Sequence, residues 1–166
     1  MTPPDRRASL LLAALLVAPL LWWAWPARTA PDVGFTLIDG RHLQTKQLRG
    51  KPLLISFWAT TCPTCLKEIP DLIALHREYA ARGLTVIGVA MPYDPPDRVV
   101  NFARSHHLPY AISLDMDAQL VHAFGDVRLT PTNILVGPRG HILEQQVGRL
   151  DPAHARRRIE QLLGEG

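Results

Sequence analysis

The chain has 166 residues, with 18 lysines and arginines against 15 aspartates and glutamates, and it contains two cysteines. This length leaves room for one folded domain with a sizeable core, and a single cysteine pair excludes both a framework of several disulfides and a zinc site made of two cysteine pairs. The only basic cluster, Arg156–Arg158, fits a solvated helix face, so we expect no nucleic-acid partner.

An almost unbroken apolar run extends from Leu10 to Trp25 and follows two arginines. It is somewhat shorter than the roughly 20 residues of a full membrane span, and a cleaved signal peptide has an apolar region of similar length. Tryptophans gather at its end, as in an aromatic belt at a membrane interface, and no clean small-x-small cleavage motif follows. We expect residues 1–30 to be an uncleaved, single-pass anchor in the cytoplasmic membrane with its linker. Residues 31–166 then lie on the extracytoplasmic side, which is the periplasm in a Gram-negative bacterium. A cleaved periplasmic form is the alternative.

The exported part begins with a predicted hairpin. Residues 33–38 and 41–43 flank an Asp-Gly turn as two short strands, and residues 45–48 suit a single helical turn. Residues 53–59 are continuously apolar instead of alternating. That pattern is typical of a central strand that is buried on both faces.

A long helix is predicted from residue 63 to 81, because apolar side chains recur there with the helical period, and Pro70 should kink it. The later elements alternate at first and then form a hairpin. In chain order they are a strand at 84–90, a helix at 97–106, a strand at 110–114, a helix at 118–124, strands at 132–136 and 142–147, and a helix at 152–163. This order predicts an α/β fold, with a central mixed sheet flanked by helices.

Both cysteines lie in the tetrapeptide Cys62-Pro63-Thr64-Cys65, between the predicted central strand and the long helix. Two thiols at this spacing can close into a disulfide within one helical turn, and a helix N-terminus favours the thiolate of the first. Pro63 suits the first helical position, where no amide hydrogen is needed. We expect a redox-active disulfide in which Cys62 is the attacking nucleophile and Cys65 resolves the mixed disulfide.

Residues 57–70, Phe-Trp-Ala-Thr-Thr-Cys-Pro-Thr-Cys-Leu-Lys-Glu-Ile-Pro, resemble the active-site signature of the thioredoxin superfamily. The apolar N-terminal segment, the early hairpin, Glu68 three positions after the second cysteine, and the extra helix and strand between Pro92 and Leu114 are similar to the membrane-anchored TlpA/ResA and DsbE (CcmG) branch of thiol-disulfide oxidoreductases. One departure is Thr61, where that family typically has tryptophan. The resemblance implies a thioredoxin fold over residues 31–166, with an N-terminal hairpin extension and a βα insert, preceded by a membrane-anchor helix.

The resemblance gives Glu68 a role in catalysis. In similar proteins this glutamate tunes the acidity of the thiols and relays protons. A nearby negative charge opposes thiolate formation, whereas a protonated carboxyl can donate, so the effect depends on burial. The alternative is an exposed glutamate that offsets Lys67.

The resemblance also implies a substrate-binding surface around the cysteine pair. Pro131 should have a cis peptide bond, and the backbone of Thr130 should pair with an extended substrate segment. Pro63 and Thr64 belong to the same surface. For Trp58 two roles are open, namely packing beneath the active site and direct contact with substrate.

We therefore expect a protein disulfide reductase without cofactor or metal, which acts on exported proteins such as apocytochrome c or copper-site proteins. A reductant in an oxidising compartment needs a membrane electron donor, of the DsbD/CcdA type, to recycle it. The alternatives are a disulfide-forming oxidant of the same fold, a copper-binding chaperone that uses both cysteines and one histidine, and, more weakly, a peroxidase. Haem attachment is disfavoured, because it needs histidine where Leu66 stands.

Overall fold

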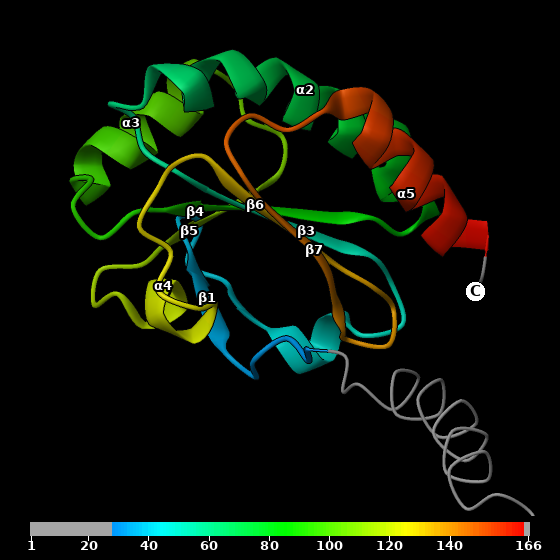
Figure 1. Ribbon diagram of the computed structural model, residues 1–166. Coiled ribbons are helices and arrows are strands. Elements are labelled where there is room, and N and C mark those ends of the chain that lie inside the picture. Colours follow the sequence, from blue (N-terminus) through cyan, green and yellow to red (C-terminus); the bar gives the residue numbers. More distant parts are fainter. Residues whose placement is uncertain (1–27, 165–166) are drawn as a thin grey trace, which may run out of the picture.

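The computed structural model describes residues 28–164, so most of the expected anchor at residues 1–30 lies outside the described part (Figure 1). Seven strands form one mixed sheet in the order β2-β1-β5-β4-β3-β6-β7. The strands are β1 (Gly34–Leu37), β2 (His42–Gln44), β3 (Leu53–Trp58), β4 (Thr85–Ala90), β5 (Ala111–Leu114), β6 (Thr132–Val136) and β7 (Ile142–Val147). Each predicted strand is confirmed to within two residues at either end.

Helices cover both faces of this sheet. They are α2 (Pro63–Tyr79), α3 (Pro96–Ser105), α4 (Gln119–Ala123) and α5 (Pro152–Gly164), with 3-10 turns at Thr45–Leu48 (η1) and Ala80–Arg82 (η2). The apolar sides of α2, α3 and α5 pack into one core cluster, and α4 packs into the other. Figure 1 accordingly shows α2, α3 and α5 above the sheet and α4 below it. The mixed sheet, the early hairpin and the inserted α3 and β5 confirm the predicted thioredoxin fold.

Strand β3 is the centre of the molecule. All six of its residues are buried, and it pairs in parallel with β4 and antiparallel with β6. A strand with neighbours on both sides and helices on both faces needs apolar side chains throughout, which explains its continuous apolar run. Because β3 leads directly into α2, its end positions the loop that carries the first cysteine.

Helix α2 continues through Pro70, which lies inside it. Proline has no amide hydrogen, so the carbonyl of Leu66 loses its helical partner there. The helix ends at Tyr79 and passes through η2 to Gly83, whose φ of 117° is left-handed and therefore favours glycine at this stop. Within residues 28–164, no helix is both long enough and apolar enough to cross a bilayer.

Candidate redox site

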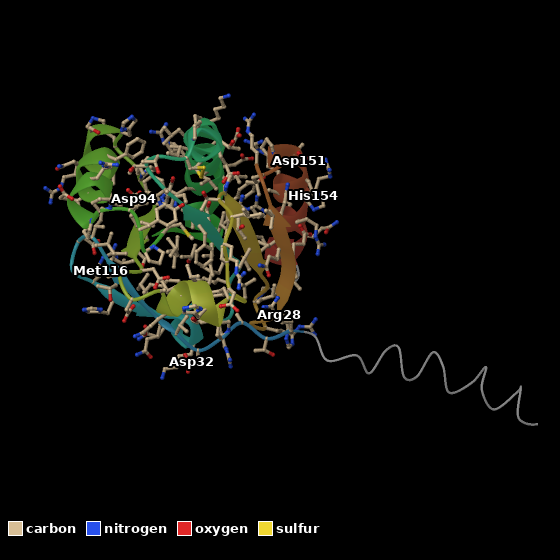
Figure 2. The ribbon with its side chains drawn as sticks, turned by 60° about the vertical axis from the view of Figure 1, so that its left-hand side comes forward. Arg28, Asp32, Asp94, Met116, Asp151 and His154 are labelled. Atoms are coloured by element: carbon tan, nitrogen blue, oxygen red, sulfur yellow. A yellow bond between two sulfur atoms is a disulfide. The ribbon has the colours of Figure 1, made fainter. Side chains whose placement is uncertain are left out.

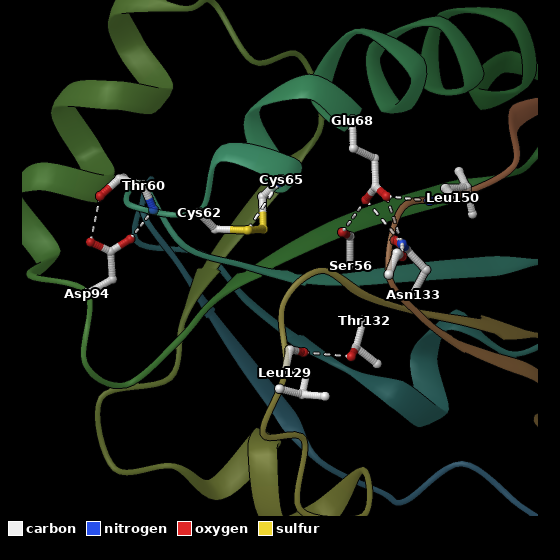
Figure 3. The surroundings of a disulfide bond; sticks show 11 residues. Ser56, Thr60, Cys62, Cys65, Glu68, Asp94, Leu129, Thr132, Asn133 and Leu150 are labelled. Atoms are coloured by element: carbon white, nitrogen blue, oxygen red, sulfur yellow. Dashed lines mark hydrogen bonds between the residues drawn. A yellow bond between two sulfur atoms is a disulfide. The ribbon is translucent and has the colours of Figure 1, made fainter.

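The cysteine pair stands at the junction of β3 and α2. Cys62 is the N-cap of α2, and Pro63 occupies the first turn. The amide N–H of Cys65 donates to Cys62 Sγ at 3.1 Å, which satisfies one of the free amides at the helix start. The two cysteines form a disulfide with their Cα atoms 5.3 Å apart (Figure 3).

The two sulfurs differ in access. Cys62 is half-buried, whereas Cys65 is 2% exposed. Pro63 and Thr64, between them, are exposed to solvent. A partner disulfide can therefore reach Cys62 more readily than Cys65, and the helix N-terminus favours a thiolate at Cys62. This geometry supports the attacking role proposed for Cys62 and the resolving role proposed for Cys65.

A buried aspartate holds the loop that precedes Cys62. Asp94, 5% exposed, accepts hydrogen bonds from the Thr60 amide at 2.5 Å and from the Thr60 hydroxyl at 2.7 Å. Asp94 comes from the loop between β4 and α3, so this contact ties two loops at one edge of the sheet (Figure 3). Sequence reasoning missed this residue, although a lone acidic side chain within the proline-rich segment 91–96 is a usable signal.

Glu68 is 1% exposed and points from α2 toward the sheet (Figure 3). Its carboxylate accepts hydrogen bonds from the hydroxyl of Ser56 at 3.2 Å and from the backbone N–H of Leu150 at 2.5 Å. The amide nitrogen of Asn133 donates to both of its oxygens, at 3.1 and 3.0 Å. The alternative of an exposed glutamate that offsets Lys67 is therefore wrong, because the helix turns position 68 inward.

Burial raises the pKa of Glu68 above the usual range of a glutamate. The hydrogen bonds from Leu150, Asn133 and Ser56 act in the opposite direction, and the nearby charge of Asp71 raises the pKa further. Desolvation outweighs the three donors. Glu68 therefore holds its proton to higher pH than an exposed glutamate does.

Ser56 and Asn133 lie side by side on the sheet and form the seat of the Glu68 carboxyl. They are paired in register across β3 and β6, and Asn133 is paired in turn with Gln146 of β7. Residues opposite one another in neighbouring strands point to the same face of the sheet. Sequence reasoning missed both. Their signal is a polar residue within an otherwise apolar buried strand.

Trp58 is 4% exposed and packs against Phe102 of α3, with ring centroids 5.4 Å apart. Its indole nitrogen is buried, with no hydrogen-bond partner among the described residues. This placement supports the packing role proposed for Trp58 and leaves it little surface for contact with substrate.

The peptide bond between Thr130 and Pro131 is cis, as the resemblance implies. Strand β6 begins immediately afterwards, and its first residue, Thr132, pairs with Phe57 near the end of β3. The loop therefore lies at the same edge of the sheet as Cys62. Pro131 is buried and Thr130 is half-buried, so a substrate-binding role for this loop stays a proposal.

Metal-ligating side chains are not clustered in the described part of the chain. Within residues 28–164 there is no group of three or more histidine, cysteine, aspartate or glutamate side chains that could hold an ion. The site thus consists of the Cys62–Cys65 pair, the buried carboxyl of Glu68 and the polar groups that hold this carboxyl. Such a set performs thiol-disulfide exchange.

Comparisons with known proteins agree with this chemistry. Residues 26–163 match the Redoxin family model. Among curated proteins, the chain is 30% identical over 122 residues to the thiol-disulfide oxidoreductase ResA of Bacillus thuringiensis strain Al Hakam, covering 73% of this chain and 69% of that protein.

Solved structures show the same relationship. A putative thioredoxin from Neisseria meningitidis is 31% identical, with a TM-score of 0.76, covering 82% of this chain and 91% of that one. A thioredoxin-family thiol:disulfide interchange protein from Chlorobium tepidum is 27% identical, also with a TM-score of 0.76, covering 84% and 98%. Fold and site together define a thiol-disulfide oxidoreductase of the thioredoxin superfamily. The chain belongs to the Redoxin family and is similar to its TlpA/ResA/DsbE-like members.

Proposed function

We propose that this oxidoreductase is a reductant, which reduces disulfides in specific exported proteins, with apocytochrome c and copper-site proteins as the substrate classes. The observation that carries the proposal is the buried carboxyl of Glu68, three residues after Cys65 on α2. Once ionised, this carboxylate is a negative charge one helical turn from Cys65, and such a charge opposes thiolate formation. An oxidant of this fold needs the opposite, because its reduced form has to be stabilised.

The reaction consists of two exchanges. The Cys62 thiolate attacks one sulfur of the substrate disulfide, and the other substrate sulfur leaves as a thiolate and takes up a proton. Cys65 then gives up its proton, which Glu68 relays. The Cys65 thiolate attacks the sulfur of Cys62, and the second substrate sulfur leaves as a thiolate and takes up a proton. Two electrons pass to the substrate, and the enzyme is left with the Cys62–Cys65 disulfide. Thr130, Pro131, Pro63 and Thr64 form the surface on which the substrate segment lies.

Turnover requires a source of electrons outside the cytoplasm. An exported reductant works only if a membrane electron donor, here of the DsbD/CcdA type, reduces its disulfide again. We further propose that residues 1–30, a membrane-anchor segment with its linker, hold the thioredoxin-like domain, residues 31–166, on the extracytoplasmic side of the cytoplasmic membrane. The apolar run from Leu10 to Trp25 supports the anchor. The mass of the mature protein tests it, because an anchored chain retains Met1 whereas a cleaved one starts near residue 30.

The reduction potential of the Cys62–Cys65 pair tests the direction of the reaction. The protein is equilibrated against glutathione buffers, and its free thiols are read by alkylation. We expect a value well below about −200 mV, which is that of a reductant. A value near about −120 mV would make the protein a disulfide donor and overturn the proposal.

A further inference from the structure

The chain enters the folded domain beside the start of β7. The amide of Ala30 donates to the carbonyl of Gly140 at 2.8 Å, and the amide of Ile142 donates to the carbonyl of Arg28 at 2.7 Å. Thr29 forms a β-bridge with His141. These contacts fix residues 28–30 to the turn between β6 and β7, so the point at which the preceding segment joins the domain is defined.

The connection between this point and the apolar run is short. The run ends at Trp25, three residues before Arg28. Even a fully extended chain spans only about 10 Å over that distance. If the run lies in the membrane, the Arg28 end of the domain is held within about that distance of the lipid surface.

Basic side chains gather at this end. Arg28 precedes the bridge, Arg139 lies in the β6–β7 turn, and the side chain of Arg49 runs alongside Gly140 of the same turn. Lys51 follows Gly50, whose amide donates to the carbonyl of Pro138 at 2.8 Å. We call these residues, together with one from η1, the basic end of the domain. Its members are Arg28, Lys46, Arg49, Lys51 and Arg139.

The basic end contains few carboxylates within its own segments of the chain. All five side chains are exposed, and none forms an ion pair with another described residue. In the segments that carry them, residues 28–33, 45–51 and 137–141, the one carboxylate is Asp32. The fields of these side chains therefore add instead of cancelling.

The cysteine pair lies at the other end of the molecule. Lys51 stands just before β3 and Cys62 follows its end, so the six residues of this strand, about 20 Å, separate them. Figure 2 shows the same arrangement. Arg28 and Asp32 lie at one end of the domain, and Asp94, which holds the Cys62 loop, lies toward the other.

We propose that the basic end rests on anionic lipid headgroups and thereby orients the domain with the Cys62–Cys65 pair pointing away from the membrane. The proposal rests on the anchor proposed above, and it adds the orientation, which the anchor alone leaves open. The connection between Trp25 and Arg28 is about as long as the Debye length, which is about 8 Å at physiological ionic strength. The basic end therefore stays within the field of the headgroups. A partner must then present its disulfide about 20 Å above the lipid surface.

The lysines of this chain provide a built-in test. There are three, and Lys46 and Lys51 belong to the basic end, whereas Lys67 lies on α2 close to the cysteine pair. The full-length protein is placed in nanodiscs of phosphatidylcholine alone or with half phosphatidylglycerol, and the acetylation rate of each lysine is measured by mass spectrometry. We expect acetylation of Lys46 and Lys51 to slow at least threefold in the anionic discs, with Lys67 unchanged. High salt should remove the difference, because it screens the headgroup charge.

Charge reversals provide matched controls. The double variant Arg49→Glu/Arg139→Glu should lose the lipid-dependent protection. The variant Arg98→Glu/Arg128→Glu changes the net charge equally at exposed positions outside the basic end and should keep it. Equal acetylation in both lipids, in a chain that retains Met1, would overturn the orientation and leave the anchor intact. A mature chain that starts near residue 30 would remove the anchor and this inference together, and the reductase proposal would still stand.

Discussion

Asn133 donates from a single amide nitrogen to both oxygens of Glu68, at 3.1 and 3.0 Å, while its own carbonyl oxygen is buried without a partner among the described residues. The side-chain amide of Asn133 thus stabilises the ionised form of Glu68. A donor favours the carboxylate over the acid, so this contact moderates the rise in pKa that burial imposes on Glu68. The two residues meet because β6 places Asn133 beneath the helix that carries the cysteines.

Replacing Asn133 by leucine should raise the pKa of Glu68 further, because a donor to its carboxylate is lost. A hydrogen bond to a charged group contributes about 1.5–3 kcal/mol, and we expect the free energy of unfolding at pH 7 to fall by about that amount. Urea unfolding measures the stability, and carboxyl NMR measures the titration. Asn101→Leu, at an exposed position on α3, is the control and should change neither. An unchanged Glu68 titration in Asn133→Leu would show that the contact does not tune the carboxyl.

Glu68→Gln should change how stability depends on pH. In the native protein Glu68 keeps its proton above the pH at which the unfolded chain, with a pKa near 4.5, releases it. The unfolded state then binds fewer protons, so the wild type loses stability as pH rises from about 4.5 through the raised pKa of Glu68. The glutamine variant lacks this loss. The difference in unfolding free energy between wild type and variant should shift in favour of the variant between pH 4 and pH 8. Parallel stability curves would contradict the raised pKa.

Single cysteine variants should separate the roles of the two thiols. Cys65→Ser leaves the accessible Cys62 without a resolving partner, so it should accumulate a mixed disulfide with a substrate disulfide. Cys62→Ser should neither reduce the substrate nor trap it, because Cys65 is buried. Non-reducing electrophoresis followed by mass spectrometry identifies the adducts. A trapped adduct in Cys62→Ser, and none in Cys65→Ser, would reverse the assignment.

Asp94→Ala should loosen the loop that precedes Cys62. The variant leaves the amide and hydroxyl of Thr60 without their acceptor, and we expect a loss of about 1.5–3 kcal/mol in unfolding free energy. The rate of disulfide exchange should fall as well, since the position of Cys62 is less fixed. Stopped-flow exchange with a model disulfide measures this rate. Asp97→Ala, at an exposed position in the first turn of α3, is the matched control and should keep both values close to wild type. If Asp94→Ala exchanges as fast as that control, the hydrogen bonds between Asp94 and Thr60 do not contribute to catalysis.

The predictable part of this molecule is the part governed by local pattern. The continuous apolar run of β3 and the helical period of α2 each determine an element without reference to the rest of the chain. The surroundings of Glu68 depend instead on register, because Ser56, Asn133 and Leu150 come from three separate segments. No local pattern gives the pairing of β3 with β6, so the role of Asn133 could not be predicted from the sequence. The contact between Asp94 and Thr60 also joins two separate loops, so the sequence could single out Asp94 as unusual but could not identify its partner.

Gly88 of β4 is closely packed beneath the site, and its replacement by alanine should therefore destabilise the protein. A Cβ at this position would lie 3.0 Å from Cδ1 of Ile112, 3.1 Å from the indole nitrogen of Trp58 and 3.3 Å from a ring carbon of Tyr110. Overpacking of this kind costs about 1–3 kcal/mol, because the neighbours must leave their rotamers. We expect Gly88→Ala to lose that much stability in urea unfolding and to change the fluorescence of Trp58. Gly34→Ala is the control, because its Cβ would meet only a carbonyl oxygen at 4.0 Å. If Gly88→Ala is as stable as Gly34→Ala, the interior beneath Trp58 has room that this packing does not indicate.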